Sequence, residues 1–421
     1  MLLNPIFLLP SFSYFAPSGC KNLLENHKGI IEELKVEKFD LIVSHIFDGC
    51  TYGLAHLFGI KTVVSFSTAF LPEHLAWLAG VPAPASLVPS LANPATDKMN
   101  FLARVKNFLL TGAVNLAFYR INRAYTDCFR DKYGAQFPSV QDLIRETQLY
   151  LLNSDIFFDF PRPNLHNILY VGGLSMEAAD PLNEKWQKIV NQSQNIVLFS
   201  LGTVASDMPD YVKTAFLNAF KNFPQHTFIC KRAGTLSSEA KNVIVDDWIP
   251  QRDLLSEAKV KAFITHGGYN SLMEAVQLGV PLIVMPLFGD QRPNAKRVER
   301  SGVGVVLNKI TLSQQSVSEA LAAVLLKEEV ASKAKLIAQM SQNKPVSALE
   351  TAIRWLEFLA EYKSLDSLKP ESRHMGLVAY YMVDVSLFLF GLLLILIWMC
   401  VMCCKFVWRT VINRRFKPKK D

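Results

Sequence analysis

The segment 263–291 carries polar residues in the order that an anion-binding turn requires. An apolar strand, Val260–Thr265, is expected to run straight into His266-Gly267-Gly268, and a helix is expected to begin at about Asn270. Backbone N–H groups and the positive end of the helix dipole would then face a bound anion. Asn270 and Ser271 are good capping residues whose side chains can also reach a phosphate. The pattern favours a nucleotide-diphosphate site.

Three further polar side chains extend this site. Glu274 lies one helical turn past Asn270 on the same face, where a carboxylate can accept hydrogen bonds from paired ribose hydroxyls. A second expected strand, 282–285, is followed by Asp290 and Gln291, whose side chains suit hydroxyl groups. The segment therefore predicts a nucleotide-diphosphate cradle with polar groups directed past the phosphate.

The first half of the chain has the alternation of a parallel α/β sheet. Strands at 39–44 and 61–66, with a helix at 51–58 between them, make one βαβ unit. The other elements expected here are a loop at 80–94, a helix at 101–133, strands at 149–153 and 169–171, and a polar linker at 180–194. The helix at 101–133 is unusually aromatic, and its apolar face suits either a core or a membrane surface. This half, 1–182, is expected to be a Rossmann-like domain.

The second half repeats the alternation more completely. Its expected strands are 195–200, 227–230, 243–245, 260–265, 282–285 and 304–307. Six strands separated by helices predict a doubly wound sheet over 183–345. A helix at about 345–362 is expected to close this domain, within a closing and linking segment at 346–375.

A membrane anchor is expected at 376–404. The segment 376–407 is almost uncharged, with Asp384 and Lys405 as its ionisable residues apart from tyrosines and cysteines. That length spans a bilayer core. The tail 405–421 is rich in Lys and Arg, and basic residues beside a span normally stay in the cytosol. The bulk of the chain is therefore expected on the other side, and a glycosylation sequon at Asn191 agrees with a lumenal domain.

The composition argues against a nucleic-acid partner. The net charge of +7 is matched by the positive charge of the short tail alone, and no basic stripe interleaved with aromatic residues occurs elsewhere. The cysteines outside the membrane segment are scattered, so neither a metal site nor a disulfide framework can be recognised. The first 17 residues lack the basic start of a secretory signal, and the chain is interpreted as beginning inside a domain.

The motifs together resemble the UDP-sugar signature of the GT-B glycosyltransferases. They are Trp248-Ile249-Pro250-Gln251, the T-H-G-G-x-N-S-x-x-E run from Thr265 to Glu274, the pair Asp290-Gln291, and the strand end Phe199–Thr203. With the membrane anchor, the chain resembles the animal UDP-glucuronosyltransferases, and its first half resembles their nematode branch. The resemblance implies an α/β GT-B fold of two Rossmann-like domains, the N-terminal one incomplete, with a C-terminal transmembrane helix.

The resemblance also implies a role for each donor-site residue. Trp248 would stack on uracil, and Gln251 would bind the ribose or the base edge. The diphosphate would lie against Gly202, Thr203, His266, Gly267, Gly268, Asn270 and Ser271. Glu274 would bind ribose hydroxyls, and Asp290 and Gln291 would bind sugar hydroxyls. The implied reaction is an inverting transfer from UDP-glucuronic acid or UDP-glucose, without a metal, a cofactor or a covalent intermediate.

The catalytic pair is harder to place. In this family a His near the start of the first domain takes the acceptor proton, and a later acid orients it. Too few residues precede 39–44 to hold the expected strands, so the region of that His is expected to be missing. By register His45 occupies the place of the acid, and Asp48 lies three positions on, as a substitute acid or as an N-cap. His45 as the base, and the more distant His27, stay open.

Two classes of function therefore stay open. One is an active transferase for a lipophilic alcohol, phenol or amine, with an apolar pocket suggested by Phe66, Phe70, Leu75, Trp77 and Leu78. The other is a catalytically silent member that binds UDP-sugar or pairs with active partners, as a homo- or hetero-oligomer. Lys417 and Lys419 resemble a dilysine retrieval signal, which indicates the endoplasmic reticulum membrane, crossed once with the bulk in the lumen.

Overall fold

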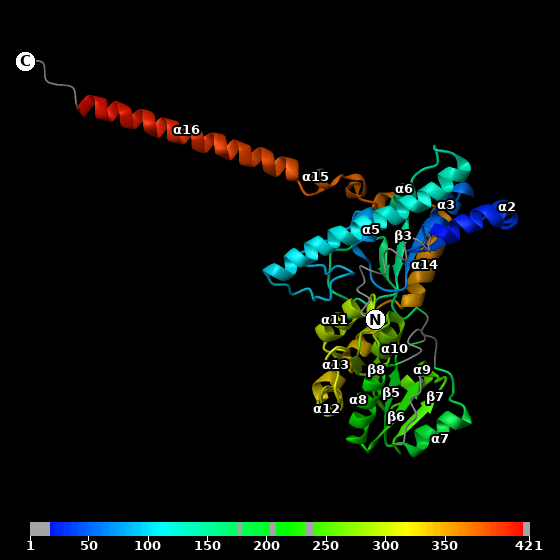
Figure 1. The fold of residues 1–421 in the computed structure, drawn as a ribbon. Helices are drawn as coiled ribbons and strands as arrows, with labels where there is room; N and C mark the ends of the chain where they lie inside the picture. Colours follow the sequence, from blue (N-terminus) through cyan, green and yellow to red (C-terminus); the bar gives the residue numbers. More distant parts are fainter. Residues whose placement is uncertain (1–16, 175–178, 203–207, 232–239, 416–421) are drawn as a thin grey trace, which may run out of the picture. The chain divides into compact units, whose positions relative to one another are not determined.

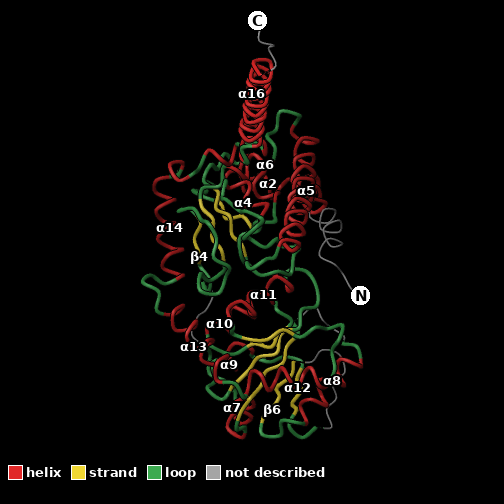
Figure 2. The backbone as a smooth tube through the Cα atoms, turned by 90° about the vertical axis from the view of Figure 1, so that its left-hand side faces the viewer, coloured by secondary structure: helices red, strands yellow, loops and turns green. Residues whose placement is uncertain are grey.

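The computed structural model describes residues 17–174, 179–202, 208–231 and 240–415 (Figure 1). The chain divides into two compact units, Met1–Pro370 and Glu371–Asp421. The first unit contains two parallel sheets and the helices that cover them (Figure 2). The second unit is helical and is described separately.

The first sheet has four parallel strands in the order β1-β2-β3-β4. They are β1 (Ile42–His45), β2 (Val63–Ser67), β3 (Leu149–Leu152) and β4 (Ile168–Tyr170). This sheet forms the first lobe together with the helices α2 (Lys28–Val36), α3 (Gly49–Leu57), α4 (Glu73–Ala79), α5 (Phe101–Tyr133) and α6 (Val140–Arg145). Helix α3 joins β1 to the parallel β2, so the predicted βαβ unit is confirmed.

Helix α5 is packed along one side only. Its N-cap is Asn100, whose side chain accepts a hydrogen bond from the N–H of Ala103. Val114, Phe118, Tyr125 and Phe129 are buried in the core of the first lobe. Large apolar side chains on its first turns stay exposed, namely Phe101, Leu102, Phe108 and Leu109. The expected core packing is therefore confirmed for the inner face, while the outer face is exposed among the described residues.

A disulfide joins Cys20 to Cys50. The sequence offered no basis for this pair, because the two cysteines are 30 positions apart and belong to no recognisable spacing. The bond ties the start of the described chain to the first turn of α3. Disulfides persist in oxidising compartments such as the lumen of the endoplasmic reticulum.

The second sheet has six parallel strands in the order β10-β9-β8-β5-β6-β7. They are β5 (Asn195–Ser200), β6 (His226–Lys231), β7 (Val243–Asp246), β8 (Val260–Thr265), β9 (Leu282–Val284) and β10 (Gly304–Val306). The predicted doubly wound sheet is confirmed. The strand order reverses direction between β5 and β8, and in such sheets ligands bind outside the carboxyl ends of the strands at that point.

Seven helices of the described chain belong to this second lobe. They are α7 (Glu184–Gln192), α8 (Asp210–Lys221), α9 (Gln251–Leu255), α10 (Tyr269–Gln277), α11 (Gln291–Ser301), α12 (Gln314–Leu325) and α13 (Glu328–Gln342). Helix α7 lies within the segment expected to be a polar linker. It forms because Asn183 caps its start and because Trp186 and Val190 bury one face.

Helix α14 (Ala348–Tyr362) packs on the first sheet, not on the second. Its Ala352 and Leu359 are buried against Val64 and Leu149. The hydroxyl of Thr62 donates to the carbonyl of Lys363, just past the helix, at 2.9 Å. The helix expected to close the second domain therefore returns the chain to the first, and the short 3-10 helix Asp366–Leu368 follows it.

Buried polar contacts join the two lobes. The Nε of Arg297 on α11 lies 2.6 Å from the Oδ1 of Asp159, and both side chains are almost fully buried. The same guanidinium stacks 3.6 Å from the ring centroid of Phe70. A second contact places the buried Asp155 carboxylate 2.7 Å from the Nζ of Lys344. The first lobe is therefore held against α11, the helix that begins at Gln291.

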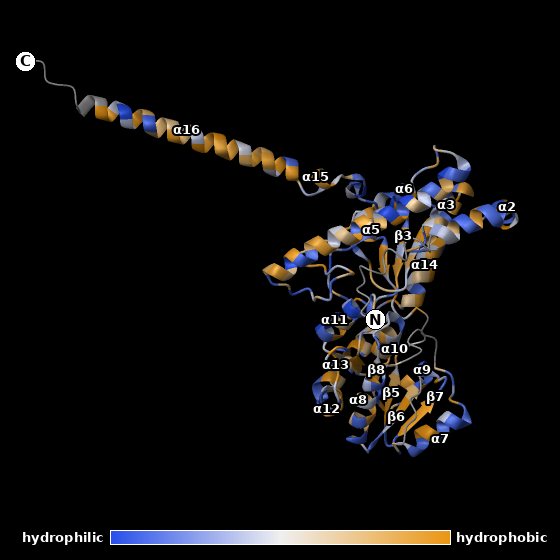
Figure 3. Cartoon of the chain, viewed as in Figure 1, coloured by the Kyte–Doolittle hydropathy of each residue, from blue (hydrophilic) through white to orange (hydrophobic). Residues whose placement is uncertain are grey.

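The second unit contains the apolar C-terminal helix. The short helices Glu371–His374 and α15 (Leu377–Tyr380) precede α16 (Val383–Arg415). Residues Val383–Ile412 form a candidate membrane span, whose most apolar 18-residue stretch has a mean hydropathy of 2.9 (Figure 3). Its side chains are exposed in the chain by itself, as expected for a helix whose apolar surface faces lipid.

We expect Arg297→Ala to lower the free energy of unfolding by about 3–5 kcal/mol, because it leaves the buried Asp159 carboxylate unpaired. Arg300→Ala is the matched control on the same helix. Arg300 also reaches the first lobe, pairing with Asp97, but it is far more exposed and should contribute no more than about 1 kcal/mol. Thermal or urea unfolding in detergent measures the free energy of unfolding of both variants. Equal losses of stability would show that the Arg297–Asp159 pair does not hold the lobes together more strongly than the exposed Arg300–Asp97 pair.

Candidate functional site

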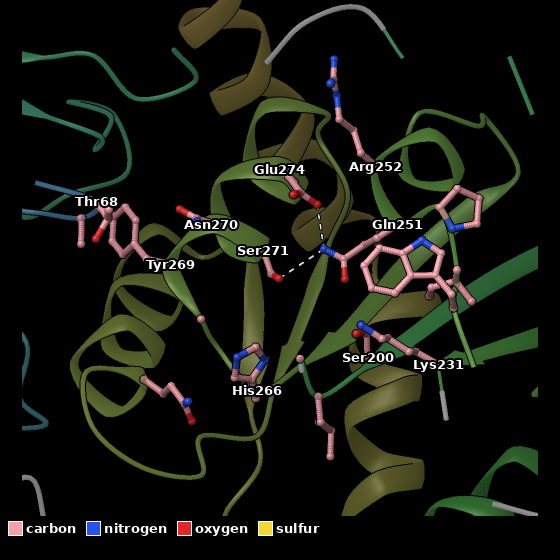
Figure 4. Close-up of a pocket in the computed structure, with 18 of the residues that line it drawn as sticks. Thr68, Ser200, Lys231, Gln251, Arg252, His266, Tyr269, Asn270, Ser271 and Glu274 are labelled. Atoms are coloured by element: carbon pink, nitrogen blue, oxygen red, sulfur yellow. Dashed lines mark hydrogen bonds between the residues drawn. The ribbon is translucent and has the colours of Figure 1, made fainter. Parts of the chain in front are cut away.

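A cleft of about 740 Å³ opens at the carboxyl ends of β5 and β8, where the strand order reverses (Figure 4). Most of the predicted donor-site residues line it. They are Gly202, Trp248, Gln251, His266, Gly268, Asn270, Ser271, Glu274, Asp290 and Gln291. Gly267 belongs to the same turn, and Thr203 lies outside the described residues. The sequence motif is thus assembled around one cavity.

The His266 ring lies between two glycines at the floor of the cleft. A Cβ atom at Gly202 would lie 2.8 Å from the ring Cε1, and one at Gly268 would lie 2.6 Å from Nε2. Both distances are shorter than any real Cβ contact, so both positions require glycine. Gly202 also has a φ of +83°, which side chains disfavour. Burial lowers the pKa of His266, which keeps the ring neutral and able to donate one hydrogen bond.

Helix α10 presents an open N-terminus to the cleft. Its N-cap is Gly268, which has no side chain to accept from the first N–H groups of the helix. These N–H groups and the helix dipole favour an anion at this end. Asn270 and Ser271 stand on the first turn, and the Asn270 side chain also accepts from Asn153 of the first lobe at 3.4 Å.

Gln251 connects two residues of α10. Its Nε2 donates to the Oε2 of Glu274 at 2.7 Å and to the Oγ of Ser271 at 3.2 Å (Figure 4). Burial raises the pKa of the Glu274 carboxyl, and the bond from Gln251 partly offsets this. The amide oxygen of Gln251 and the second carboxylate oxygen of Glu274 are thereby oriented as acceptors for hydroxyl or N–H groups.

Trp248 follows β7 and is 68% exposed, which rules out the alternative that it is a core residue. The backbone N–H of Trp248 donates to the Oδ1 of Asp246 at 3.2 Å. The Nζ of Lys231, at the end of β6, lies 4.3 Å from the centroid of the Trp248 ring. A flat apolar surface with a cation above it therefore forms one wall of the cleft.

The acidic corner of the cleft is tied to the glycine turn. The Nδ2 of Asn294 donates to the Oδ2 of Asp290 at 2.9 Å and to the carbonyl of Gly267 at 3.0 Å. The Oε1 of Gln291 accepts from the N–H groups of Leu287 and Phe288, at 2.8 and 3.0 Å. Burial raises the pKa of Asp290. Asp290 thus has one carboxylate oxygen engaged, and Gln291 keeps its Nε2 for another partner.

Several lining residues were not predicted from the sequence. Lys231 is one, although its place directly after an apolar strand of a parallel sheet was a usable signal. Thr68 and Ala69, which follow β2, bring the first lobe to the same cleft. Of the five apolar residues expected at an acceptor pocket, Phe70, Leu75 and Leu78 are buried in the core, and none of the five is among the described residues that line this cleft.

His45 and Asp48 lie at the carboxyl end of β1, and they are not among the described residues that line the cleft. Asp48 caps α3, where its Oδ1 accepts from the N–H of Cys50 at 2.9 Å and its Oδ2 accepts from the hydroxyl of Thr51. The Nδ1 of His45 accepts from the N–H of Phe47 at 3.4 Å. In this arrangement the His45 proton sits on Nε2, and Asp48 does not orient the ring.

Comparison with known proteins agrees with the cleft geometry. Residues 5–418 match the family model described as "UDP-glucoronosyl and UDP-glucosyl transferase". UDP-glucuronosyltransferase 1A9 of Homo sapiens is 32% identical over 407 residues, which cover 96% of this chain and 76% of that protein. UDP-glucuronosyltransferase 1A7 of Mus musculus is 31% identical over 408 residues, with the same coverage of each chain.

Solved structures share the arrangement of the two lobes' sheets. A UDP-glucose: anthocyanidin 3-O-glucosyltransferase in complex with UDP superposes with a TM-score of 0.59 at 18% identity, covering 83% of this chain and 81% of that chain. A UDP-glucosyltransferase from Polygonum tinctorium capable of glucosylating indoxyl gives a TM-score of 0.59 at 17% identity, covering 83% and 82%. The predicted GT-B fold is confirmed, and the chain belongs to the UDP-glucuronosyl and UDP-glucosyl transferase family, whose members transfer a sugar from a UDP-sugar donor.

Proposed function

We propose that this protein transfers glucuronic acid from UDP-glucuronic acid to a small lipophilic acceptor, with inversion at the anomeric carbon. The observation that carries the proposal is the cleft at the carboxyl ends of β5 and β8. There an uncapped helix N-terminus, an exposed tryptophan and a half-buried carboxylate face one cavity. These groups match, in order, a diphosphate, a flat base and a ribose.

The proposed donor pose follows from the direction of these groups. Uracil stacks on Trp248, where a flat ring buries the face of the base. The ribose hydroxyls donate to Glu274, which Gln251 already orients. The diphosphate receives hydrogen bonds from the first N–H groups of α10 and from the neutral ring of His266.

The sugar is assigned to the corner at Asp290 and Gln291, the end of the cleft that α11 connects to the first lobe. The Oδ2 of Asp290 and the Oε1 of Gln291 accept hydrogen bonds within the protein, while the Oδ1 of Asp290 and the Nε2 of Gln291 suit sugar hydroxyls. Glucuronic acid is preferred over glucose because the human and mouse relatives described above are named UDP-glucuronosyltransferases. Arg252 is not the carboxylate partner in this proposal, since its side chain points away from His266 and Ser271 (Figure 4).

A catalytically silent member that binds UDP-sugar is the second candidate. The observation that favours it is the pairing at β1, where Asp48 caps a helix and does not orient His45. An inverting transfer needs a base to take the acceptor proton, and a correctly placed base contributes about 10²–10⁴-fold. Product formation with a phenol acceptor separates the two candidates, because donor binding alone fits both.

The proposed location is the endoplasmic reticulum membrane, with both lobes in the lumen. The span Val383–Ile412 is followed by basic residues that favour the cytosolic side. The disulfide between Cys20 and Cys50 supports an oxidising compartment for the first lobe. Both features are independent of the donor site.

Trp248→Ala should weaken UDP binding roughly 5- to 150-fold, because stacking of a base on an aromatic ring contributes about 1–3 kcal/mol. His266→Ala should also weaken it, through the loss of one hydrogen bond to the diphosphate. Tyr211→Ala and His166→Ala are the matched controls, since both residues are exposed and lie outside the cleft lining. Calorimetry on the full chain in detergent gives the affinities, and a Trp248 variant with unchanged affinity would refute the base position.

Asp290→Asn should weaken binding of UDP-glucuronic acid and UDP-glucose about tenfold, the usual effect of losing a hydrogen bond to a charged group. UDP itself should bind almost as before, because it lacks the sugar and because Asn can still accept from Asn294. Equal losses for UDP and the UDP-sugars would assign Asp290 a structural role.

Transfer to a phenol by the unmodified protein should proceed with UDP-glucuronic acid and be much slower with UDP-glucose.

Protease added to sealed microsomes should remove only the basic tail, because the membrane protects both lobes. Asn191 is exposed and should carry a glycan that Asn191→Gln abolishes. Cys20 and Cys50 should react with a thiol reagent only after reduction. Digestion of residues 17–370 in sealed vesicles, confirmed to be intact by a lumenal marker, would overturn the topology.

A further inference from the structure

Lys231 has the position of a residue that couples base binding to phosphate binding. It ends β6, and the preceding Cys230 pairs with Phe199 of β5, which places Lys231 beside the turn that contains Gly202. Its side chain lines the cleft, and its ammonium covers the ring of Trp248 at 4.3 Å, on the wall formed by the ends of β6 and β7. Lys231 therefore lies between the expected base position at Trp248 and the Gly202 turn, where the phosphate is expected.

The cleft has few other cations. Among the described residues that line it, Arg252 is the other one with a permanent positive charge, and its side chain points away from Ser200 and His266 (Figure 4). The remaining charged side chains of the lining are acidic, namely Asp180, Asp253, Glu274 and Asp290. Among the described lining residues, Lys231 is thus the flexible cation that faces a doubly charged diphosphate entering this cleft.

A stacked base and the Lys231 ammonium compete for the Trp248 ring. A cation over an exposed tryptophan contributes about 0.5–1 kcal/mol, which a base has to replace when it stacks on the same face. The lysine stem is flexible, and the ammonium is a point charge that binds phosphate from many directions. Displacement from the ring thus leaves Lys231 free to move toward the Gly202 turn.

We propose that Lys231 covers the Trp248 ring in the empty cleft and moves to the diphosphate when the donor binds. This inference rests on the proposed base position at Trp248. Its consequence is selectivity for charged nucleotides: a nucleoside has to displace the lysine and offers it nothing in return, whereas a nucleoside diphosphate displaces it and then binds it. Lys231 is accordingly a donor-binding residue that distinguishes UDP from uridine.

The test is the affinity of the full chain for uridine, UMP and UDP, measured by calorimetry for the parent and for Lys231→Ala. The variant should bind UDP roughly tenfold or more weakly, because a charge-assisted hydrogen bond to the phosphate is lost. It should bind uridine about two- to fivefold more tightly, because the competing cation over the ring is gone. UMP should fall between the two. Opposite signs for uridine and UDP are the signature of the proposal.

Two matched variants define the controls. Lys231→Arg keeps the charge and should retain most of the UDP affinity. Lys261→Ala removes an exposed lysine of β8 that donates to a backbone carbonyl outside the cleft lining, and it should leave both affinities unchanged. The parent should also lose UDP affinity with added salt more steeply than Lys231→Ala does, since one ion pair is screened.

The outcomes separate this inference from the proposed function. If Trp248→Ala leaves UDP affinity unchanged, the base position is wrong and the inference fails with it. If Trp248→Ala weakens UDP binding while Lys231→Ala leaves the ratio of UDP to uridine affinity unchanged, the donor site stands and the inference alone is wrong. A looser binding of uridine by Lys231→Ala would likewise overturn it, by showing that the lysine supports the base.

Discussion

The space around the His266 ring is the constraint on which the donor cleft depends. The ring lies so close to Gly202 and Gly268 that neither position has room for a Cβ atom. This contact brings the end of β5 against the start of α10, so that two backbone turns and one neutral imidazole converge on one point. An anion at that point meets donors that are already fixed, and it need not order flexible side chains on binding.

The two lobes contribute to the cleft unequally. The proposed base, ribose and phosphate contacts all come from the second lobe, while the first lobe supplies Thr68 and Ala69. Its position is set by buried contacts behind the cleft, where Asp159 pairs with Arg297 and Asp155 pairs with Lys344. Because Arg297 is on the helix that begins at Gln291, the same helix carries both the proposed sugar corner and the lobe contact. Geometry at the sugar is therefore coupled to the fit between the lobes.

The parts of the fold that follow local rules could be predicted from the sequence. Apolar runs bounded by Gly and Pro located the strands, and the motif from Thr265 to Glu274 located the glycine turn and α10. The side of the molecule on which α14 packs could not be predicted, because an amphipathic pattern gives a buried face but not its partner. The Cys20–Cys50 pair was missed for a similar reason, since distance in space is not encoded in their spacing.

The same distinction applies to the site residues: those within a sequence motif could be predicted, and those outside one could not. Asp290 and Gln291 were found because they belong to a motif, whereas Lys231 is a single lysine in a segment with no motif of its own. Asp48 had two interpretations from sequence, and the structure shows the capping one, with both carboxylate oxygens used by α3. The pair thus has the geometry of a helix cap, which is the observation that favours the catalytically silent candidate.

The charge balance of the cleft explains why it can hold an acidic donor at all. Four carboxylates line it, but burial raises the pKa of Glu274 and of Asp290, which lowers the cost of bringing a diphosphate near them. Burial also keeps His266 neutral, so the fixed part of the phosphate site consists of dipoles and not of full charges. Such a site favours an anion without holding it permanently, since the helix terminus contributes only about 0.3–1 kcal/mol per charge at an exposed site. In the proposed order of binding, Lys231, a flexible cation among the described lining residues, supplies attraction after the base has taken its place on Trp248.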